Sequence, residues 1–247
     1  MPSYTALLGI VLTSAVAVHA QTYTNCNPMN KTCPADTGLD QWTFTTNFTE
    51  GEGSLGKNWT SAIGTNVTFN DKGAIFNITD DTQAPTISSA FYVLFGQVEV
   101  VMQASPGTGI VSSIVLESDD LDEIDWEWLG GNDTSVETNY FGKGNTSSYD
   151  RAYYYAVDSP TTEMHTYTID WTKDAVKWSI DGQVVRTLEY SDANGGVDFP
   201  QTPLRVKLGN WCGGCSAAGE GTVEWAGGNT TFEDAPYLMY VESVKVR

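Results

Sequence analysis

Positively charged residues are scarce in this sequence. It contains 12 Lys and Arg residues against 31 Asp and Glu residues, which gives a formal net charge of −19 over 247 residues. Contacts to nucleic-acid phosphates need Lys and Arg side chains, so this balance argues against a nucleic-acid partner. An acidic surface instead fits a well-solvated secreted protein.

Charged residues of both signs make up only 17% of the chain, whereas glycine (24 residues) and aromatic residues (12%) are frequent. Helical bundles need many Glu, Lys, Leu and Ala residues, so this composition argues against them. Abundant glycine and aromatic residues favour β-structure with many tight turns. The hydrophobic content of 40% is sufficient for one sizeable core.

Long apolar runs are also missing. The run at residues 6–18 (ALLGIVLTSAVAV) is too short to span a bilayer, and Val18 and Ala20 are small residues that suit a cleavage site. This pattern predicts a signal peptide at residues 1–20, although residues 1–5 contain no Lys or Arg. A transmembrane anchor is the alternative. The stalk and hydrophobic tail of a GPI-anchored protein are not visible, so the protein is either freely secreted or longer than this chain.

Cysteine and histidine are few. The four cysteines form two close pairs, Cys26 with Cys33 and Cys212 with Cys215. In a secreted chain both pairs are expected to be disulfides. For the second pair, half of a zinc site or a redox dithiol is the alternative, but His19 and His165 are the only histidines that could add ligands. We therefore expect no metal and no cofactor.

Secretion is also indicated by many sequons for N-glycosylation. None of them has proline at the middle position, and each is a possible glycan site. The sequons begin at Asn30, Asn47, Asn58, Asn66, Asn77, Asn132, Asn145 and Asn229.

Short strand-like runs, separated by Gly, Asn, Asp and Pro, fill the chain after residue 40. Their close and regular spacing predicts an all-β sandwich or barrel. Asp181-Gly182 between two such runs is a strong hairpin signal. No linker divides the chain, so we expect one domain over residues 21–247. The predicted strands are 42–48, 67–69, 74–78, 87–95, 97–104, 110–117, 123–129, 136–141, 153–157, 165–171, 176–180, 183–188, 204–208, 222–225 and 237–246.

The most informative stretch is residues 122–128 (DEIDWEW). As a strand, it places Glu123, Asp125 and Glu127 on one face and the apolar residues between them on the other. Like charges on one face destabilise a strand, so a purely structural role explains this stretch poorly. Paired carboxylates are the groups that retaining glycosidases use. Their mutual repulsion keeps at least one carboxyl protonated, as a general acid requires.

The motif Glu-Ile-Asp-x-Glu resembles the active-site signature of glycoside hydrolase family 16, in its regular-strand form without an extra bulge residue. Further segments are similar to the fungal cell-wall transglycosylases of the CRH type, which link chitin to glucan. These segments cover nearly all of residues 23–246. They are 109–120 (GIVSSIVLESDD), 122–131 (DEIDWEWLGG), 138–144 (TNYFGKG), 165–171 (HTYTIDW), 207–211 (KLGNW), 224–228 (EWAGG) and the early CNP and TCP around Cys26 and Cys33.

The resemblance implies a β-jelly-roll sandwich of two antiparallel sheets with a concave substrate groove. It also implies that Glu123 is the nucleophile, Asp125 the assisting carboxylate and Glu127 the acid/base that also contacts substrate. The enzyme would cleave chitin and transfer it to β-glucan or chitin acceptors through a covalent glycosyl-enzyme. Cell-wall polysaccharides would be its partners, the fungal cell wall its location, and a monomer its state.

Six further residues are candidate sugar contacts. Trp211 either stacks on a sugar ring or covers the neighbouring cysteine pair, and Lys207 is either a donor to sugar hydroxyls or a solvated charge. His165 is either a groove residue or a structural histidine. Large aromatics bury readily, so Tyr140 and Trp171 fit the core as well as a groove. Thr222, on a predicted strand, faces away from Val223 and Trp225.

Two other functions share this pattern. A hydrolase of chitin or β-glucan passes through the same covalent intermediate, so the motif does not separate hydrolysis from transfer. A non-catalytic lectin is the third alternative, because jelly rolls also serve as lectins. A lectin has no need of three aligned carboxylates, and their presence weighs against it.

Overall fold

A computed structural model describes residues 23–62, 65 and 67–247 of the chain. The predicted signal peptide and the sequon at Asn66 lie outside the described residues. Within them, no helix has both the length and the apolar character needed to cross a membrane.

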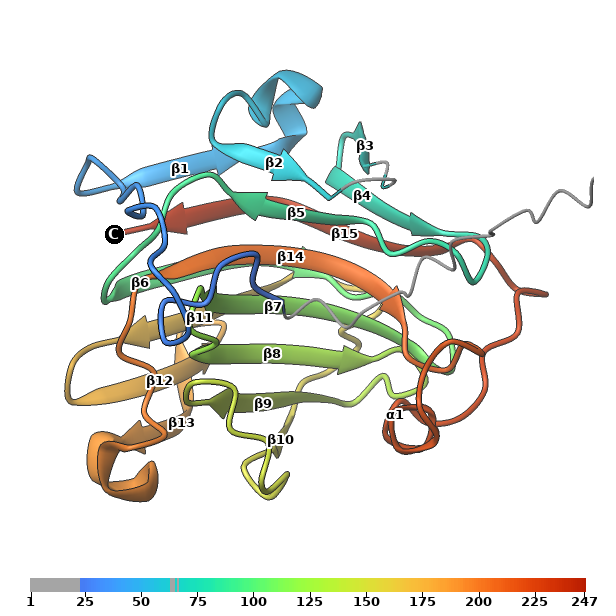
Figure 1. Cartoon of the computed structure of the whole chain (residues 1–247). Helices are drawn as coiled ribbons and strands as arrows, with labels where there is room; N and C mark the ends of the chain where they lie inside the picture. The colour runs from blue at the N-terminus through green and yellow to red at the C-terminus, as the bar shows by residue number, and fades with distance from the viewer. Residues whose placement is uncertain (1–22, 63–64, 66) are drawn as a thin grey trace, which may run out of the picture.

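The described residues form two antiparallel sheets packed face to face (Figure 1). This arrangement is the predicted all-β sandwich. The first sheet has seven strands, and it carries the acidic stretch in its middle. In spatial order these strands are β10 (Tyr153–Ala156), β9 (Ser135–Phe141), β8 (Glu123–Leu129), β7 (Ile110–Ser118), β14 (Leu204–Cys212), β5 (Thr86–Ser89) and β2 (Trp59–Ser61).

The second sheet has eight strands and covers the other side of the core. The Asp181-Gly182 turn joins its first two strands, with both residues at positive φ (48° and 79°), which confirms the predicted hairpin. The strand order is β13 (Gln183–Glu189), β12 (Ala175–Ile180), β11 (His165–Trp171), β6 (Gly96–Gln103), β15 (Tyr237–Val246), β4 (Gly73–Ile78) and β3 (Val67–Asn70), with β1 (Phe44–Asn47) also paired to β15.

The remaining elements are short helices. One prediction was wrong here: residues 222–225 belong to α1 (Glu220–Trp225) and not to a strand. The four-residue window fits both periods, and the backbone closes as a helix because Val223 N–H donates to Gly219 O and Ala226 N–H to Thr222 O. The 3-10 helices are η1 (Phe48–Glu50), η2 (Glu52–Ser54), η3 (Tyr190–Asp192) and η4 (Asn194–Gly196).

The apolar side of β8 anchors the core beneath the acidic stretch. Ile124, Trp126 and Trp128 are fully buried, and the two tryptophans pack edge-on against Tyr167 of β11. The indole Nε1–H of Trp178, from β12, donates to the carbonyl oxygen of Asp125 at 3.0 Å. The second sheet thus fixes the backbone of β8 at the centre of the acidic row.

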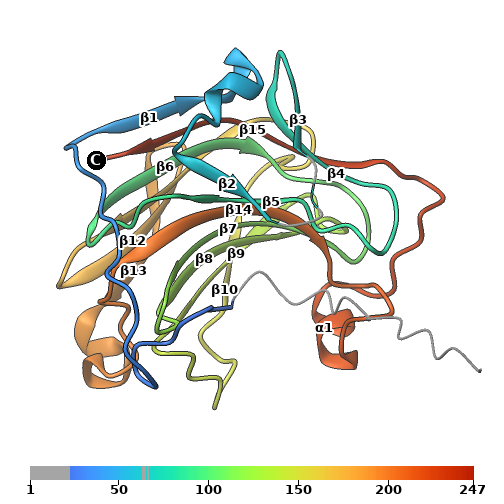
Figure 2. The same ribbon diagram turned by 45° about the horizontal axis from the view of Figure 1, so that its top comes forward.

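The opposite side of β8 faces away from the second sheet. We call this surface of the seven-stranded sheet the acid face. The N-terminal segment from Tyr23 lies at one end of β7 and β14, and α1 lies at the other (Figures 1 and 2). Tyr23 contacts β14 from the first end, and Trp225 of α1 contacts it from the second. These two segments therefore border the sheet face that carries the acids.

The hydrogen bond from Trp178 to Asp125 gives a prediction. Replacing Trp178 with Phe keeps a ring in the core but removes a buried donor, which costs about 1–3 kcal/mol. We expect a lower denaturant midpoint for Trp178→Phe. The matched control is Trp42→Phe, because Trp42 is 95% exposed and such surface changes stay within about 0.5 kcal/mol. Equal midpoints for the two variants would contradict the proposed role of this contact.

Candidate active site

Regular pairing on both sides of β8 aligns its three acids. The registers of β8 with β7 and with β9 run without a shift, so no bulge interrupts the alternation. Glu123, Asp125 and Glu127 therefore point together onto the acid face, as predicted. Asp125 is 1% exposed, and the two glutamates keep part of their surface accessible. Solvent or a substrate reaches the glutamates while Asp125 stays enclosed between them.

Burial and mutual repulsion shift the titration of all three acids. Burial raises the pKa of Glu123 to about 7, against an opposing effect of Asp125. Burial, and then the charges of Glu123 and Glu127, raise the pKa of Asp125 well above its usual value. Burial, Glu137 and Glu123 do the same for the pKa of Glu127. The row therefore holds protons that isolated carboxyls would have lost.

Asp125 is the most enclosed of the three acids. Neither of its carboxyl oxygens makes a hydrogen bond of good geometry among the described residues. The carboxyl of Glu123 is nevertheless close enough for the two groups to influence each other's pKa. A proton shared with Glu123 would satisfy one of these oxygens, since buried polar atoms are rarely left without a partner.

The start of β8 is held by Asp122, whose side chain is fully buried. Its carboxylate accepts hydrogen bonds from the backbone N–H of Lys143 (2.9 Å), the backbone N–H of Gln201 (2.9 Å) and the hydroxyl of Thr202 (2.7 Å). These bonds tie the turn before β8 to two distant loops. These hydrogen bonds also fix the backbone position of Glu123, the next residue.

A buried ion pair lies beside Glu123. Glu117 of β7 is directly opposite Glu123 in the register, and the ammonium of Lys207 is paired with its carboxylate. The Tyr23 ring lies 4.9 Å from the Lys207 nitrogen. Burial lowers the pKa of Lys207 to about 8. Lys207 thus lies on the acid face, as a sugar contact requires. Its ammonium group forms an ion pair with Glu117.

A second group lies beside Glu127. Glu137 of β9 is directly opposite Glu127 and is 2% exposed. The indole Nε1–H of Trp225 donates to its carboxylate at 2.7 Å. Trp225 in turn stacks on Trp211, with ring centroids 6.0 Å apart and planes 23° apart. The Trp211–Trp225 pair therefore lies at the Glu127 end of the row of acids.

Three predicted sugar contacts lie near this border or on the same face. Lys207 and Trp211 share the face of β14 that continues the acid face, as the register with β7 requires. Trp211 is only 8% exposed, because Trp225 covers it. Thr222 is half-buried in α1, the helix that carries Trp225.

Three other predicted contacts lie elsewhere. Tyr140 pairs with Ile124 and therefore faces the core. Trp171 is buried between the sheets, where its Nε1–H donates to Pro200 O at 2.9 Å. His165 lies in the second sheet, with its ring nitrogens 2.7 Å from an Asp181 carboxylate oxygen and 2.8 Å from Asp158 O. All three were predicted from segments that resemble the family. Tyr140 lies on the core side of β9, and His165 and Trp171 belong to β11 of the second sheet, so none of them is on the acid face.

Sequence reasoning missed the partners of the acidic row. Glu117 and Glu137 lie on the same sheet face as the three acids, because each is directly opposite one of the glutamates. Finding this pairing requires the strand register, which the sequence alone does not supply. Tyr154 faces the same way as Glu137 through its pairing with β9. Burial and the Glu137 carboxylate raise the pKa of Tyr154.

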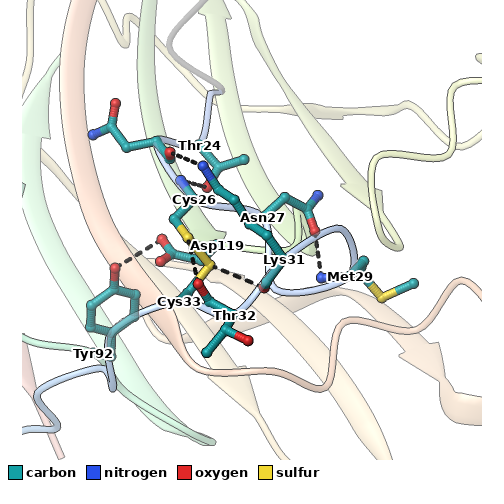
Figure 3. The surroundings of a disulfide bond; sticks show 10 residues. Thr24, Cys26, Asn27, Met29, Lys31, Thr32, Cys33, Tyr92 and Asp119 are labelled. Carbon is teal, nitrogen blue, oxygen red and sulfur yellow. Dashed lines mark hydrogen bonds between the residues drawn. A yellow bond between two sulfur atoms is a disulfide. The ribbon is translucent and has the colours of Figure 1, made fainter.

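Both predicted disulfides are present. The loop closed by Cys26 and Cys33 lies over one end of the acid face, near Asp119 (Figure 3). Asp119 accepts a hydrogen bond from the Tyr92 hydroxyl at 2.9 Å. The second disulfide follows Trp211 directly and holds the turn that leads to α1.

Two hollows lined by described residues lie away from the acids. One, of about 510 Å³, is beside the Cys26–Cys33 loop, and the other, of about 670 Å³, lies between Tyr153 and Arg186 near the outer ends of both sheets. Neither includes Glu123, Asp125 or Glu127 in its lining.

Comparison with known proteins shows the family to which the chain belongs. Residues 55–227 match the family described as glycosyl hydrolases family 16. The chain belongs to this family. The match includes β8, whose three carboxylates lie on one face.

Several curated relatives of the chain are fungal proteins. The chain is 56% identical over 227 residues to Crh-like protein 5 of Aspergillus fumigatus, covering 92% of this chain and 57% of that protein. It is 54% identical to Crh-like protein 2 of Botryotinia fuckeliana, covering 93% and 51%. The chain thus spans between about half and 60% of the length of these relatives.

Solved structures of family 16 proteins are similar as well. A Crh5 transglycosylase in complex with NAG is 56% identical, with a TM-score of 0.86 and 90% of each chain covered. A Bacillus licheniformis beta-glucanase is 24% identical, with a TM-score of 0.68, covering 84% of this chain and 99% of that one. The second likeness shows the fold alone, and it confirms the jelly-roll prediction.

The raised pKa of Glu123 predicts how stability depends on pH. From the ordinary value of 4.5 up to about 7, the folded protein keeps a proton that the unfolded chain loses. The free energy of unfolding therefore falls as pH rises through this window, by about 1–3 kcal/mol from Glu123. In Glu123→Gln this contribution disappears, so the variant gains stability relative to the native protein between pH 4 and 7.5.

Urea unfolding at several pH values measures this difference. The exposed Glu163 gives the matched control, and Glu163→Gln should follow the native pH dependence. Parallel stability curves for the native protein and Glu123→Gln would show that the Glu123 carboxyl is not perturbed.

Proposed function

We propose that this protein is a retaining transglycosylase of fungal cell-wall polysaccharide. It cleaves chitin and transfers the released chain to β-glucan or chitin acceptors through a covalent glycosyl-enzyme. The observation that carries the proposal is the row of three proton-retaining carboxyls on one open sheet face. It is supported by 56% identity, over 90% of the chain, to a transglycosylase solved in complex with NAG.

The first half of the reaction uses the two ends of the row. Glu127 carries a proton because burial and neighbouring acids raise its pKa, so it is suited to protonate the leaving oxygen. Glu123 attacks the anomeric carbon, and the glycosidic bond breaks as the bond to Glu123 forms. Retaining enzymes hold such carboxyl groups about 5–5.5 Å apart. Asp125, between them, would assist by sharing a proton with Glu123 as the charge on Glu123 changes.

The second half returns the proton. Glu127, now ionised, removes the proton from an acceptor hydroxyl, whose oxygen attacks the anomeric carbon and displaces Glu123. A sugar hydroxyl gives transfer and water gives hydrolysis. The aromatic border formed by Trp211 and Trp225 is placed to bind a sugar ring on the Glu127 side. An acceptor bound there occupies the place that water would otherwise take.

Substrate contacts follow from the same placement. Glu127, Lys207, Trp211 and Thr222 are proposed to contact the polysaccharide. Lys207 would donate through hydrogens not used by Glu117, and Thr222 through its hydroxyl at the surface of α1.

The setting of the reaction is part of the proposal. Residues 1–20 act as a signal peptide, and residues 21–247 form one catalytic domain that works as a secreted monomer at the fungal cell wall. The two disulfides support an oxidising compartment.

Single replacement of the two glutamates tests the catalytic roles. Glu127→Gln removes the proton donor and should lower kcat by about 10²–10⁴-fold on an unactivated oligosaccharide. Glu123→Gln removes the nucleophile and should abolish turnover. Rates are measured from chitin oligosaccharides, with Glu163→Gln as the control that keeps native activity. Unchanged turnover in either active-site variant would sink the assignment.

Labelled acceptors separate transfer from hydrolysis. With a chitin oligosaccharide donor and separately labelled glucan and chitin acceptors, the proposal predicts elongated labelled products. If new reducing ends form without any elongated label, the protein is a hydrolase on the same fold.

A further inference from the structure

The two catalytic glutamates have unequal neighbours on the acid face. Each faces another buried glutamate across one strand pair: Glu117 opposite Glu123, and Glu137 opposite Glu127. Side chains directly opposite in an antiparallel pair have Cβ atoms about 4.5–5.5 Å apart. Like charges at this separation repel strongly, so the difference lies in how each neighbouring charge is balanced.

Glu117 is balanced by a cation. Its carboxylate is paired with the ammonium of Lys207, and the pair is nearly buried. The pair carries no net charge, and it leaves Glu123 beside a neutral group.

Glu137 is not balanced in this way. None of the ion pairs within residues 23–62, 65 and 67–247 includes it. Its hydrogen-bond partners are uncharged donors: Trp225 Nε1–H at 2.7 Å and Asn139 Nδ2–H at 3.4 Å. Trp225 donates to one carboxyl oxygen of Glu137 and Asn139 to the other, so both oxygens act as acceptors, which is the arrangement that suits a carboxylate. These donors hold the negative charge in place without cancelling it.

The other groups that face Glu127 do not offset this charge. On its own strand they are the acids Glu123 and Asp125, and on β7 the opposite residue is the uncharged Ser113. From β10 comes Tyr154, a neutral hydroxyl beside Glu137. From α1 comes Trp225, and the two acids of that helix, Glu220 and Glu224, are exposed. Among the charged groups that raise the pKa of Glu127, Glu137 has the largest effect.

We propose that Glu137 is a positioning residue whose uncompensated charge keeps the proton on Glu127, while the neutral Glu117–Lys207 pair leaves Glu123 free to ionise. The asymmetry gives the two ends of one acidic strand different chemical roles. The proposal rests on the proposed function and adds a fourth carboxyl to its machinery.

The same charge serves both halves of the reaction. While Glu127 is protonated, it can transfer the proton to the leaving oxygen as the glycosidic bond breaks. The carboxylate left behind lies opposite the charge of Glu137, which makes it a stronger base toward the acceptor hydroxyl. The proton taken from the acceptor restores Glu127, and no other reactant is needed.

Replacement of Glu137 by Gln tests the proposal. Glutamine has the same shape and still accepts from Trp225, so the fold should be kept. We expect the pKa of Glu127 to fall by about one unit. A ¹³C-carboxyl NMR titration, with Glu127 identified by its loss in Glu127→Gln, measures this without an activity assay. The alkaline limb of kcat/KM against pH should move to lower pH by the same amount.

Two variants complete the test. Glu137→Asp keeps the charge and should restore most of the native Glu127 titration, and Glu163→Gln should leave both readouts unchanged. A uniform loss of rate in Glu137→Gln, with the Glu127 titration in its native position, would overturn the proposal and leave a structural role. If the titration moves but Glu127→Gln remains fully active, the electrostatic effect exists and the proposed function is what fails.

Discussion

The structure depends on the cost of gathering carboxyl groups on one sheet face. Five of them, Glu117, Glu123, Asp125, Glu127 and Glu137, occupy neighbouring positions on three strands. Each loses hydration, and adjacent negative charges repel, so the face is stable only if protons or partners neutralise part of it. The raised pKa values of the three central acids show that protons supply a large share.

The rest of the fold supplies the other interactions that stabilise the gathered carboxyl groups. The core side of β8 is filled with tryptophans, and Trp178 fixes the backbone at Asp125. Lys207 neutralises Glu117, and Trp225, brought by α1, hydrogen-bonds Glu137. Like charges on one face of β8 repel each other. The strand nevertheless keeps its regular register, because its other face packs in the core and the neighbouring carboxyls have partners. The Glu127 end of the row is the one whose neighbouring carboxyl, Glu137, has no cation paired with it among the described residues.

The sequence was sufficient for the part of this that depends on local pattern. Alternation along 122–128 correctly separated the acids from Ile124, Trp126 and Trp128, and Asp181-Gly182 correctly marked a hairpin. What it could not supply was register. Glu137 and Tyr140 are three residues apart in one segment, yet one faces the acids and the other the core. The short helix at 220–225 was mistaken for a strand because its window was too brief to show a period.

The central claim is that Glu123 and Glu127 divide the work of one covalent mechanism. The most direct test uses Glu127→Gln with a chitin-oligosaccharide donor whose fluoride leaving group needs no acid. The account predicts a glycosyl-enzyme that forms and persists, and peptide mass spectrometry should place the sugar on Glu123. A sugar attached to another residue, or rapid turnover of this donor without any adduct, would contradict it.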